Sequence, residues 1–129
     1  MASSEKNILI VEDNQDQAQA LAMHAKGKGY LPKIAYDTTI GRMMLQQFKI
    51  DLVILDLGLP GGGGLFMLEN MKKSFKTYDI PVVVLTAKIE AGLEEKVREK
   101  GVSEYFVKPC PMEKLFGAID AILRPPAKK

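Results

Sequence analysis

Five polar side chains of the sequence follow directly on short runs of apolar residues. Glu12 and Asp13 follow the run 8–11, Asp56 follows 52–55, Thr86 follows 82–85, and Lys108 follows 105–107. Carboxylates, a hydroxyl and an ammonium group that lie together can bind a divalent cation and act on a phosphoryl group. This chemistry requires that the elements carrying the residues bring them to one place.

The apolar runs are typical of parallel β-strands covered on both faces. Each run is continuous rather than alternating, and helix-like stretches separate one run from the next. Parallel strands end at one common edge of a sheet, and open α/β sheets bind their ligands at that edge. We therefore predict that the polar residues meet in a single pocket.

The stretches between the strands carry helix signals. Asn14 and Gln17 have capping-box spacing before the first helix, Asp37 or Thr38 caps the second, and Pro111 suits the first turn of the fifth. The predicted apolar faces of the second, third, fourth and fifth helices are, in turn, Ile40, Met43, Met44 and Phe48; Leu65, Leu68, Met71 and Phe75; Leu93 and Val97; and Met112, Leu115, Phe116, Ile119, Ile122 and Leu123. The result is an all-parallel (βα)₅ chain with right-handed crossovers, so helices cover both faces of the sheet.

The length and composition of the chain limit its class. A chain of 129 residues has room for one domain, predicted over residues 1–124, followed by a C-terminal tail or linker remnant at 125–129. A formal net charge of +2 without long Lys/Arg runs argues against direct binding of nucleic acid. The absence of a signal-peptide stretch or a membrane-spanning run favours a cytoplasmic protein without membrane contact.

The three carboxylates predict a metal-assisted phosphoryl site. Glu12, Asp13 and Asp56 in one pocket would repel one another, and partial burial would raise their pKa values unless a cation compensates. Mg²⁺ prefers oxygen ligands and is commonly held by one or two carboxylates plus phosphate oxygens. We predict Asp56 as the nucleophile that forms an acyl phosphate, with Thr86 and Lys108 each contacting a phosphoryl oxygen.

In this order and at these strand ends, the residues resemble the receiver domain of two-component response regulators, including single-domain chemotaxis regulators. The resemblance rests on the acidic pair Glu12-Asp13, on Asp56, on Thr86-Ala87 and on Lys108-Pro109, and it covers essentially the whole chain. It implies a flavodoxin-like (βα)₅ sandwich, doubly wound, with strand order 2-1-3-4-5. It also implies a signalling module that catalyses only its own phosphorylation and autodephosphorylation, not an enzyme with a separate substrate.

The resemblance assigns roles to these residues. Asp56 is the expected phosphoacceptor. Asp13 and Asp56 are expected to contact Mg²⁺, Glu12 to act on it mainly through water, and the backbone carbonyl of Gly58 to be a further ligand. Thr86 and Tyr105 occupy the switch positions, where a phosphoryl group draws in the hydroxyl and the aromatic ring turns inward. An aromatic residue in a strand can also serve only for packing.

The resemblance further implies two kinds of partner. A histidine kinase or a histidine phosphotransfer protein is expected to supply the phosphoryl group. A downstream protein, or a second copy of the chain in a homodimer, is expected to bind the surface formed by the fourth helix, the fifth strand and the fifth helix. The residues after Arg124 leave two possibilities open, namely signalling by protein contact alone or membership of a longer regulator.

The sequence departs from the family pattern in the loop 59–64, which reads Leu-Pro-Gly-Gly-Gly-Gly. Family members usually have Asp or Asn where this chain has Gly63, so a side-chain cap for the third helix is missing. This departure motivates an alternative function, a receiver-like module that binds proteins without switching. Gly58 and Lys88 stand at the two positions that in this family tune the attack of water on the acyl phosphate.

Other functions are disfavoured by residues that the chain lacks. A nucleotide P-loop needs a Lys-Ser/Thr pair after its glycines, and none follows Gly64. A phosphatase with an aspartate nucleophile needs a second acid two residues later, where this chain has Gly58. A flavodoxin would carry a Ser/Thr-rich phosphate loop after the first strand.

Overall fold

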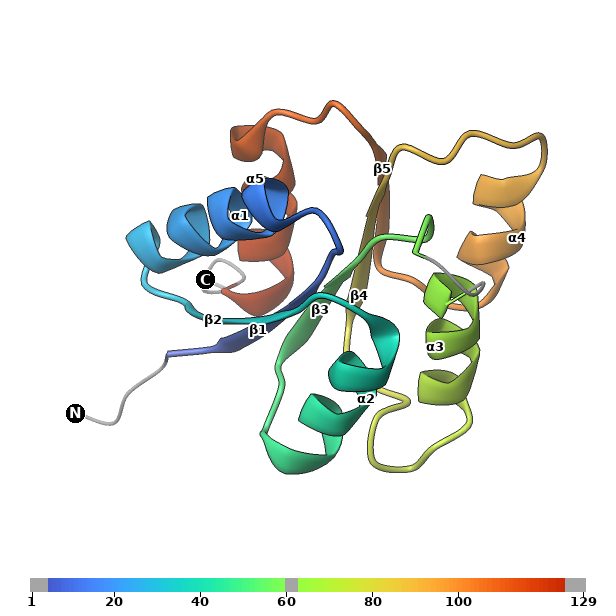
Figure 1. Ribbon diagram of the computed structural model, residues 1–129, viewed down its shortest axis with the longest axis horizontal. Coiled ribbons are helices and arrows are strands. Elements are labelled where there is room, and N and C mark those ends of the chain that lie inside the picture. The colour runs from blue at the N-terminus through green and yellow to red at the C-terminus, as the bar shows by residue number, and fades with distance from the viewer. Residues whose placement is uncertain (1–4, 60–62, 125–129) are drawn as a thin grey trace, which may run out of the picture.

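The computed structural model describes residues 5–59 and 63–124, in which strands and helices alternate (Figure 1). The predicted tail at 125–129 and the loop residues 60–62 lie outside the described residues. The strands are β1 (Asn7–Val11), β2 (Leu31–Ala35), β3 (Leu52–Leu55), β4 (Val82–Thr86) and β5 (Glu104–Val107). The helices are α1 (Gln15–Gly27), α2 (Thr38–Gln47), α3 (Gly63–Lys72), α4 (Leu93–Glu99) and α5 (Met112–Leu123).

The strands form one parallel sheet in the order β2-β1-β3-β4-β5, which confirms the predicted flavodoxin-like topology. The register pairs Val11 at the end of β1 with Leu55 at the end of β3. Because these two residues are paired in register, the residues that follow them, Glu12 and Asp56, lie side by side at the carboxyl edge of the sheet.

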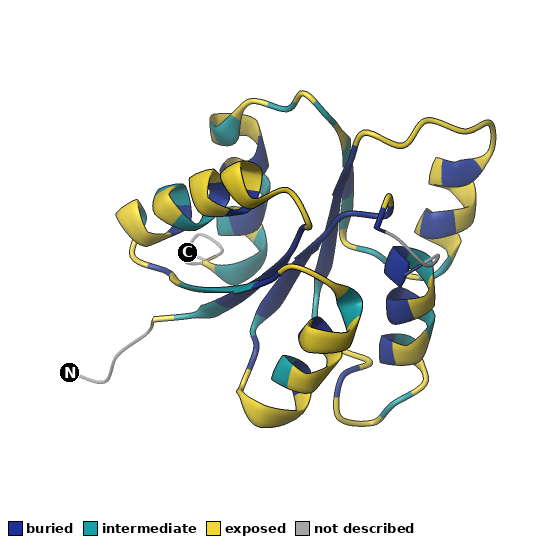
Figure 2. Cartoon of the chain, in the orientation of Figure 1, coloured by how far each residue is buried: buried dark blue, intermediate teal, exposed yellow. Residues whose placement is uncertain are grey.

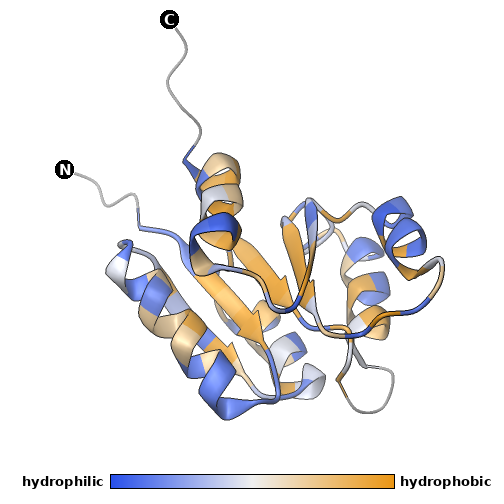
Figure 3. Cartoon of the chain, turned by 90° about the horizontal axis from the view of Figure 1, so that it is seen from above, coloured by the Kyte–Doolittle hydropathy of each residue, from blue (hydrophilic) through white to orange (hydrophobic). Residues whose placement is uncertain are grey.

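Helices cover both faces of the sheet, α1 and α5 on one face and α2, α3 and α4 on the other (Figure 1). Successive strand residues point to opposite faces, so Ile10 packs in the α1/α5 core and Val11 in the other. Figure 2 shows the central strands β1, β3 and β4 buried between helices whose outer sides are exposed, and Figure 3 shows strands that are strongly hydrophobic. No helix in the described ranges is long and apolar enough to span a membrane.

Side-chain caps start the first two helices. Asn14 accepts a hydrogen bond from the Gln17 N–H at 2.9 Å, as the spacing predicts. Asp37, rather than Thr38, caps α2 by accepting from the Ile40 N–H at 2.8 Å. Pro111 is the N-cap residue of α5, so its predicted place in the first turn is one residue wrong.

The predicted apolar face of α2 is wrong for Ile40, Met43 and Phe48, whereas Met44 packs against the core as predicted. Leu45 is 4% exposed and Gly41 is buried, whereas Met43 is 48% exposed, and Ile40 and Phe48 are also exposed. A Cβ atom on Gly41 would lie 3.3 Å from side-chain atoms of Val11 and of Met67. The helix therefore turns its glycine toward the sheet to allow this close approach, and a hydrophobic pattern gives no sign of a buried glycine.

The predicted length of the third helical stripe is also wrong. Helix α3 ends at Lys72, and Phe75, expected on its buried face, is 97% exposed. Turns follow the helix, with the Thr77 and Tyr78 N–H groups donating to the Ser74 carbonyl. Thr77 is buried and its hydroxyl donates to the Met71 carbonyl at 2.8 Å, so a polar residue, not Phe75, closes this end of the core.

Candidate functional site

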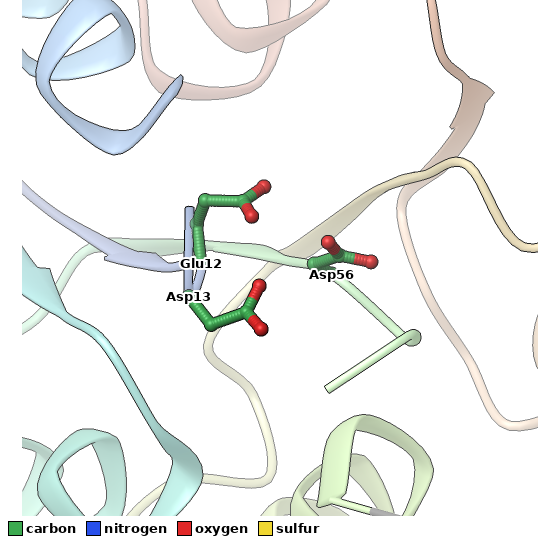
Figure 4. A group of neighbouring side chains, drawn as sticks. All are labelled: Glu12, Asp13 and Asp56. Atoms are coloured by element: carbon green, nitrogen blue, oxygen red, sulfur yellow. The ribbon is translucent and has the colours of Figure 1, made fainter. Parts of the chain in front are cut away.

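Three carboxylates converge at the carboxyl edge of the sheet. Glu12 and Asp13 follow β1 and Asp56 follows β3 (Figure 4), and one carboxylate oxygen from each of the three lies within 4.8 Å of the other two. Glu12 is 3% exposed and Asp56 is 8% exposed, while Asp13 is exposed. Oxygen-only ligands of this kind are suited to a hard divalent cation, so the cluster could hold a metal ion.

Donors from three directions hold the Asp56 carboxylate. Its Oδ1 accepts hydrogen bonds from the Gly58 N–H and from the Thr86 hydroxyl, each at 2.9 Å. Its Oδ2 lies 3.2 Å from Nζ of Lys108. The Asp56 backbone N–H donates to the Val11 carbonyl at 3.1 Å, which ties the residue to the end of β1.

Thr86 is fully buried at the end of β4. Its Oγ1 accepts a hydrogen bond from the Lys88 backbone N–H at 3.1 Å, so the hydroxyl hydrogen is directed to Asp56. The hydroxyl therefore links the Asp56 carboxylate to the segment that connects β4 with α4.

Lys108 reaches the pocket from the end of β5, where its backbone N–H donates to the Thr86 carbonyl at 2.8 Å. Its Nζ lies 2.6 Å from Oε1 of Glu12 and 2.6 Å from Oε1 of Gln17. The structure thus brings together the sequence-predicted residues Glu12, Asp13, Asp56, Thr86 and Lys108. From the sequence, Gln17 was predicted only as part of the capping box of α1, and that spacing gives no sign of its contact with Lys108.

The charged groups of the pocket shift one another's pKa values. Burial raises the pKa of Glu12 above its ordinary value, although hydrogen bonds from Lys108 and from the Asn14 N–H oppose the shift. Burial by itself would lower the pKa of Lys108, but the hydrogen bond to Glu12 and the charges of Asp56 and Glu12 outweigh it, so this pKa is raised. A single ammonium among three carboxylates leaves an excess of negative charge that favours a bound cation.

Two glycines let the start of α3 approach the pocket. A Cβ atom on Gly64 would lie 2.5 Å from the Asp56 carbonyl oxygen and 2.6 Å from Leu57 Cα, closer than carbon atoms can come. A Cβ atom on Gly63 would lie 2.9 Å from side-chain atoms of Thr38, at the start of α2. Gly63 is the first residue of α3, so the position that was expected to cap this helix lies inside it, where the Thr38 side chain packs against it.

The remaining predicted residues lie at the edge of the pocket or outside it. Gly58 contacts Asp56 through its N–H, and the use of its carbonyl as a metal ligand stays a prediction. Tyr105 is paired in register with Val84, is 7% exposed, and packs in one core cluster with Leu93 and Val97 of α4. Burial and the nearby charge of Glu94 raise the pKa of Tyr105.

Comparison with known proteins places this geometry in a family. The profile of the response regulator receiver domain matches residues 8–120. The phosphate regulon transcriptional regulatory protein PhoB of Escherichia coli K12 is 35% identical over 121 residues, which cover 92% of this chain and 52% of PhoB. The transcriptional regulatory protein BasR of the same organism is 36% identical over 119 residues, covering 91% of this chain and 52% of BasR. The chain thus spans about half the length of these curated relatives.

Solved structures show the same fold. The receiver domain of HemR from Leptospira biflexa, in its non-phosphorylated form, superposes with a TM-score of 0.85 at 26% identity, covering 97% of this chain and 99% of that one. A CheY-like receiver domain protein from Methanospirillum hungatei JF-1 also gives 0.85, at 23% identity over 92% of this chain and 94% of that one. The profile match, the two transcriptional regulators and the acidic pocket agree: this chain belongs to the response regulator receiver domain family, a signalling module of two-component systems rather than an enzyme.

Proposed function

We propose that the chain is a phosphorylation-dependent switch in which Asp56 accepts a phosphoryl group from a histidine kinase or a histidine phosphotransfer protein. The observation that carries the proposal is the surroundings of the Asp56 carboxylate. A hydroxyl and an ammonium contact its oxygens, and two further carboxylates lie within reach of one metal ion. These are the groups that positioning and charge neutralisation in phosphoryl transfer require.

The proposed step moves one phosphoryl group. An oxygen of Asp56 donates an electron pair to phosphorus and forms the O–P bond of an acyl phosphate. The P–N bond of the phosphohistidine breaks, and its electron pair stays on the imidazole nitrogen. The Lys108 ammonium and the Thr86 hydroxyl then donate to two phosphoryl oxygens. Mg²⁺ would be held by Asp13 and Asp56, by Glu12 mainly through water, and by the Gly58 carbonyl. Its positive charge would offset the negative charge of the phosphoryl oxygens.

The proposed output passes through Thr86. When the hydroxyl turns to a phosphoryl oxygen, the hydrogen bond from the Lys88 N–H moves with it and shifts the segment before α4. Tyr105 belongs to the same core cluster as Leu93 and Val97 of α4, so a shift of α4 would also change the surroundings of this ring. We infer that a downstream protein, or a second copy in a homodimer, reads the surface of α4, β5 and α5. Residues 1–124 would form the receiver domain, and it would act in the cytoplasm.

The alternative is a receiver-like module that binds proteins without switching, which the loop 59–64 motivates. Gly63 begins α3 rather than capping it, and the Thr38 side chain fills the space beside it, 2.9 Å from where a Cβ atom would stand. This filling supports an ordered start of α3 close to Asp56, so the observation favours the switch over the alternative.

The test is the intact mass of the chain after incubation with acetyl phosphate, with and without Mg²⁺. We expect a gain of one phosphoryl group that requires Mg²⁺ and disappears in Asp56→Asn. Asp16→Asn, which changes an exposed aspartate at the start of α1, is the matched control and should be modified like the native chain. If the native chain gains no mass and beryllofluoride with Mg²⁺ leaves its NMR spectrum unchanged, the switch is overturned and the non-switching module stands.

A further inference from the structure

The Lys108 ammonium has three acceptors, one for each of its N–H donors. Nζ lies 2.6 Å from Glu12 Oε1, 2.6 Å from Gln17 Oε1 and 3.2 Å from Asp56 Oδ2. The two short contacts come from Glu12, which follows β1, and from Gln17 in the first turn of α1, and the long contact points to the predicted phosphoacceptor. The ammonium is thus held from one side and directed toward Asp56 on the other.

Gln17 is available to Lys108 because the capping box of α1 is divided. In a complete box the side chain of the third helical residue accepts from the backbone N–H of the cap residue. Here the Asn14 N–H donates instead to Glu12 Oε2 at 3.1 Å, and only the Asn14 side chain keeps its role, accepting from the Gln17 N–H at 2.9 Å. The Gln17 side chain is left to bind Lys108, 91 residues along the chain.

These contacts close a ring of four residues. Asn14 donates to Glu12, Lys108 donates to Glu12 and to Gln17, and the Gln17 N–H donates back to Asn14. Each member of the ring therefore restrains the others, and the fixed end of α1 becomes a support for the Lys108 side chain. The side chain of Lys108 is only 17% exposed, so water competes little for its ammonium group.

We propose that Gln17 is a positioning residue which, with Glu12, orients the Lys108 ammonium so that its third N–H is ready for a phosphoryl oxygen on Asp56. The inference rests on the proposed phosphorylation of Asp56. A neutral amide suits this task because it accepts a hydrogen bond without adding a fourth negative charge to the pocket. A carboxylate at the same place would compete with the phosphoryl group for Lys108.

The test compares Gln17→Met with Gln19→Met. Methionine and glutamine have similar helix propensity and length, so both variants should unfold like the native chain. Gln19 is exposed on the same helix, and it is not among the hydrogen-bond partners of the Lys108 ammonium in the described part of the chain, so it serves as the matched control. Two quantities are measured: the affinity for beryllofluoride with Mg²⁺ by calorimetry, and the ¹H–¹⁵N signal of the Lys108 ammonium in the metal-free protein.

We expect Gln17→Met to bind beryllofluoride about fivefold more weakly, the effect of losing one hydrogen bond. The Lys108 ammonium signal, which persists only while hydrogen bonds slow its exchange with water, should be lost in Gln17→Met and kept in Gln19→Met. Unchanged or tighter binding by Gln17→Met, or an ammonium signal that is kept, would overturn the role of Gln17. Failure of the native chain to bind beryllofluoride would instead overturn the proposed switch.

Discussion

The Thr86 hydroxyl donates a hydrogen bond of 2.9 Å to Oδ1 of Asp56, although the two residues are 30 positions apart in the chain. The contact exists because β3 and β4 are neighbours in the sheet and deliver both side chains to its carboxyl edge. The same hydroxyl accepts from the Lys88 N–H at 3.1 Å. Two hydrogen bonds through the Thr86 hydroxyl therefore connect Asp56 with the backbone that leads to α4.

Thr86→Val should lower the free energy of unfolding by about 2 kcal/mol, because a hydrogen bond to a charged carboxylate and the acceptor of the Lys88 N–H are both lost. Valine keeps the shape of the side chain, so packing is unchanged. Denaturant unfolding of the native chain, Thr86→Val and Thr86→Ser measures the effect. Thr86→Ser keeps the hydroxyl, so its free energy of unfolding should fall less than that of Thr86→Val. An equal fall in the two variants would show that the hydroxyl is not the stabilising group.

Gly64→Ala should destabilise the fold by about 3 kcal/mol or more, because its Cβ atom would clash with the backbone of Asp56 and Leu57. Unlike a side chain, this backbone cannot relieve the clash by changing its rotamer. Gly63→Ala should cost less, because the atoms it meets belong to the rotatable side chain of Thr38. Chemical denaturation of the two variants gives the comparison.

Gly117→Ala in α5 is the control for these glycine substitutions. A Cβ atom there meets nothing within 4 Å, so helix propensity should raise stability by about 0.5–1 kcal/mol. The combination of Gly63→Ala with Thr38→Ser removes one methyl group from the contact and should recover part of the loss. A cost at Gly63 equal to that at Gly64 would contradict this account.

Leu45→Ala should lower the free energy of unfolding by about 2–4 kcal/mol, because the side chain is buried in the core between α2, α3 and the sheet. Met43→Ala on the exposed side of the same helix should change it by about 0.5 kcal/mol or less. Thermal or urea unfolding of both variants checks which face of α2 is turned inward. If Met43→Ala lowered the free energy of unfolding more than Leu45→Ala did, the face predicted from the sequence pattern would be the one turned inward.

Tyr30→Phe should change how stability depends on pH at the alkaline end. Burial, with a hydrogen bond to Asp120 and the charge of that carboxylate, raises the pKa of Tyr30 from 10.0 to about 12. The folded state holds this proton more tightly than the unfolded state, so the stabilisation is complete below pH 10 and is lost as the pH rises toward 12.

The measurement for Tyr30 is denaturant unfolding of the native chain and of Tyr30→Phe between pH 9 and 12. The native chain should lose about 2 kcal/mol more than the variant over this interval, and the variant should lack the phenol that ionises last in an absorbance titration. Tyr36→Phe, which changes a partly exposed tyrosine, is the control and should follow the native chain. The prediction would be contradicted if the free energy of unfolding fell equally with pH in the native chain and in Tyr30→Phe.

The sequence was sufficient to predict the sheet and the group of residues at its edge. The runs 8–11, 52–55 and 82–85 are continuous and apolar, which is typical of strands buried on both faces, and parallel strands end together. Glu12, Asp13, Asp56, Thr86 and Lys108 therefore meet for a reason that is visible in the order of residue types. The helix caps at Asn14 and Asp37 were predictable because a cap is a contact within three residues.

The details that the sequence pattern missed depend on contacts between distant segments. The inward face of α2 is decided by the close approach of Gly41 to Val11 and Met67, and the turn after α3 leaves Phe75 exposed. By itself, the sequence determined which chemical groups stand at the strand ends, because hydrophobic runs and caps are local and periodic. Only the tertiary structure decided which helix faces turn inward and that Gln17 reaches Lys108, because packing brings together side chains whose separation along the chain carries no signal.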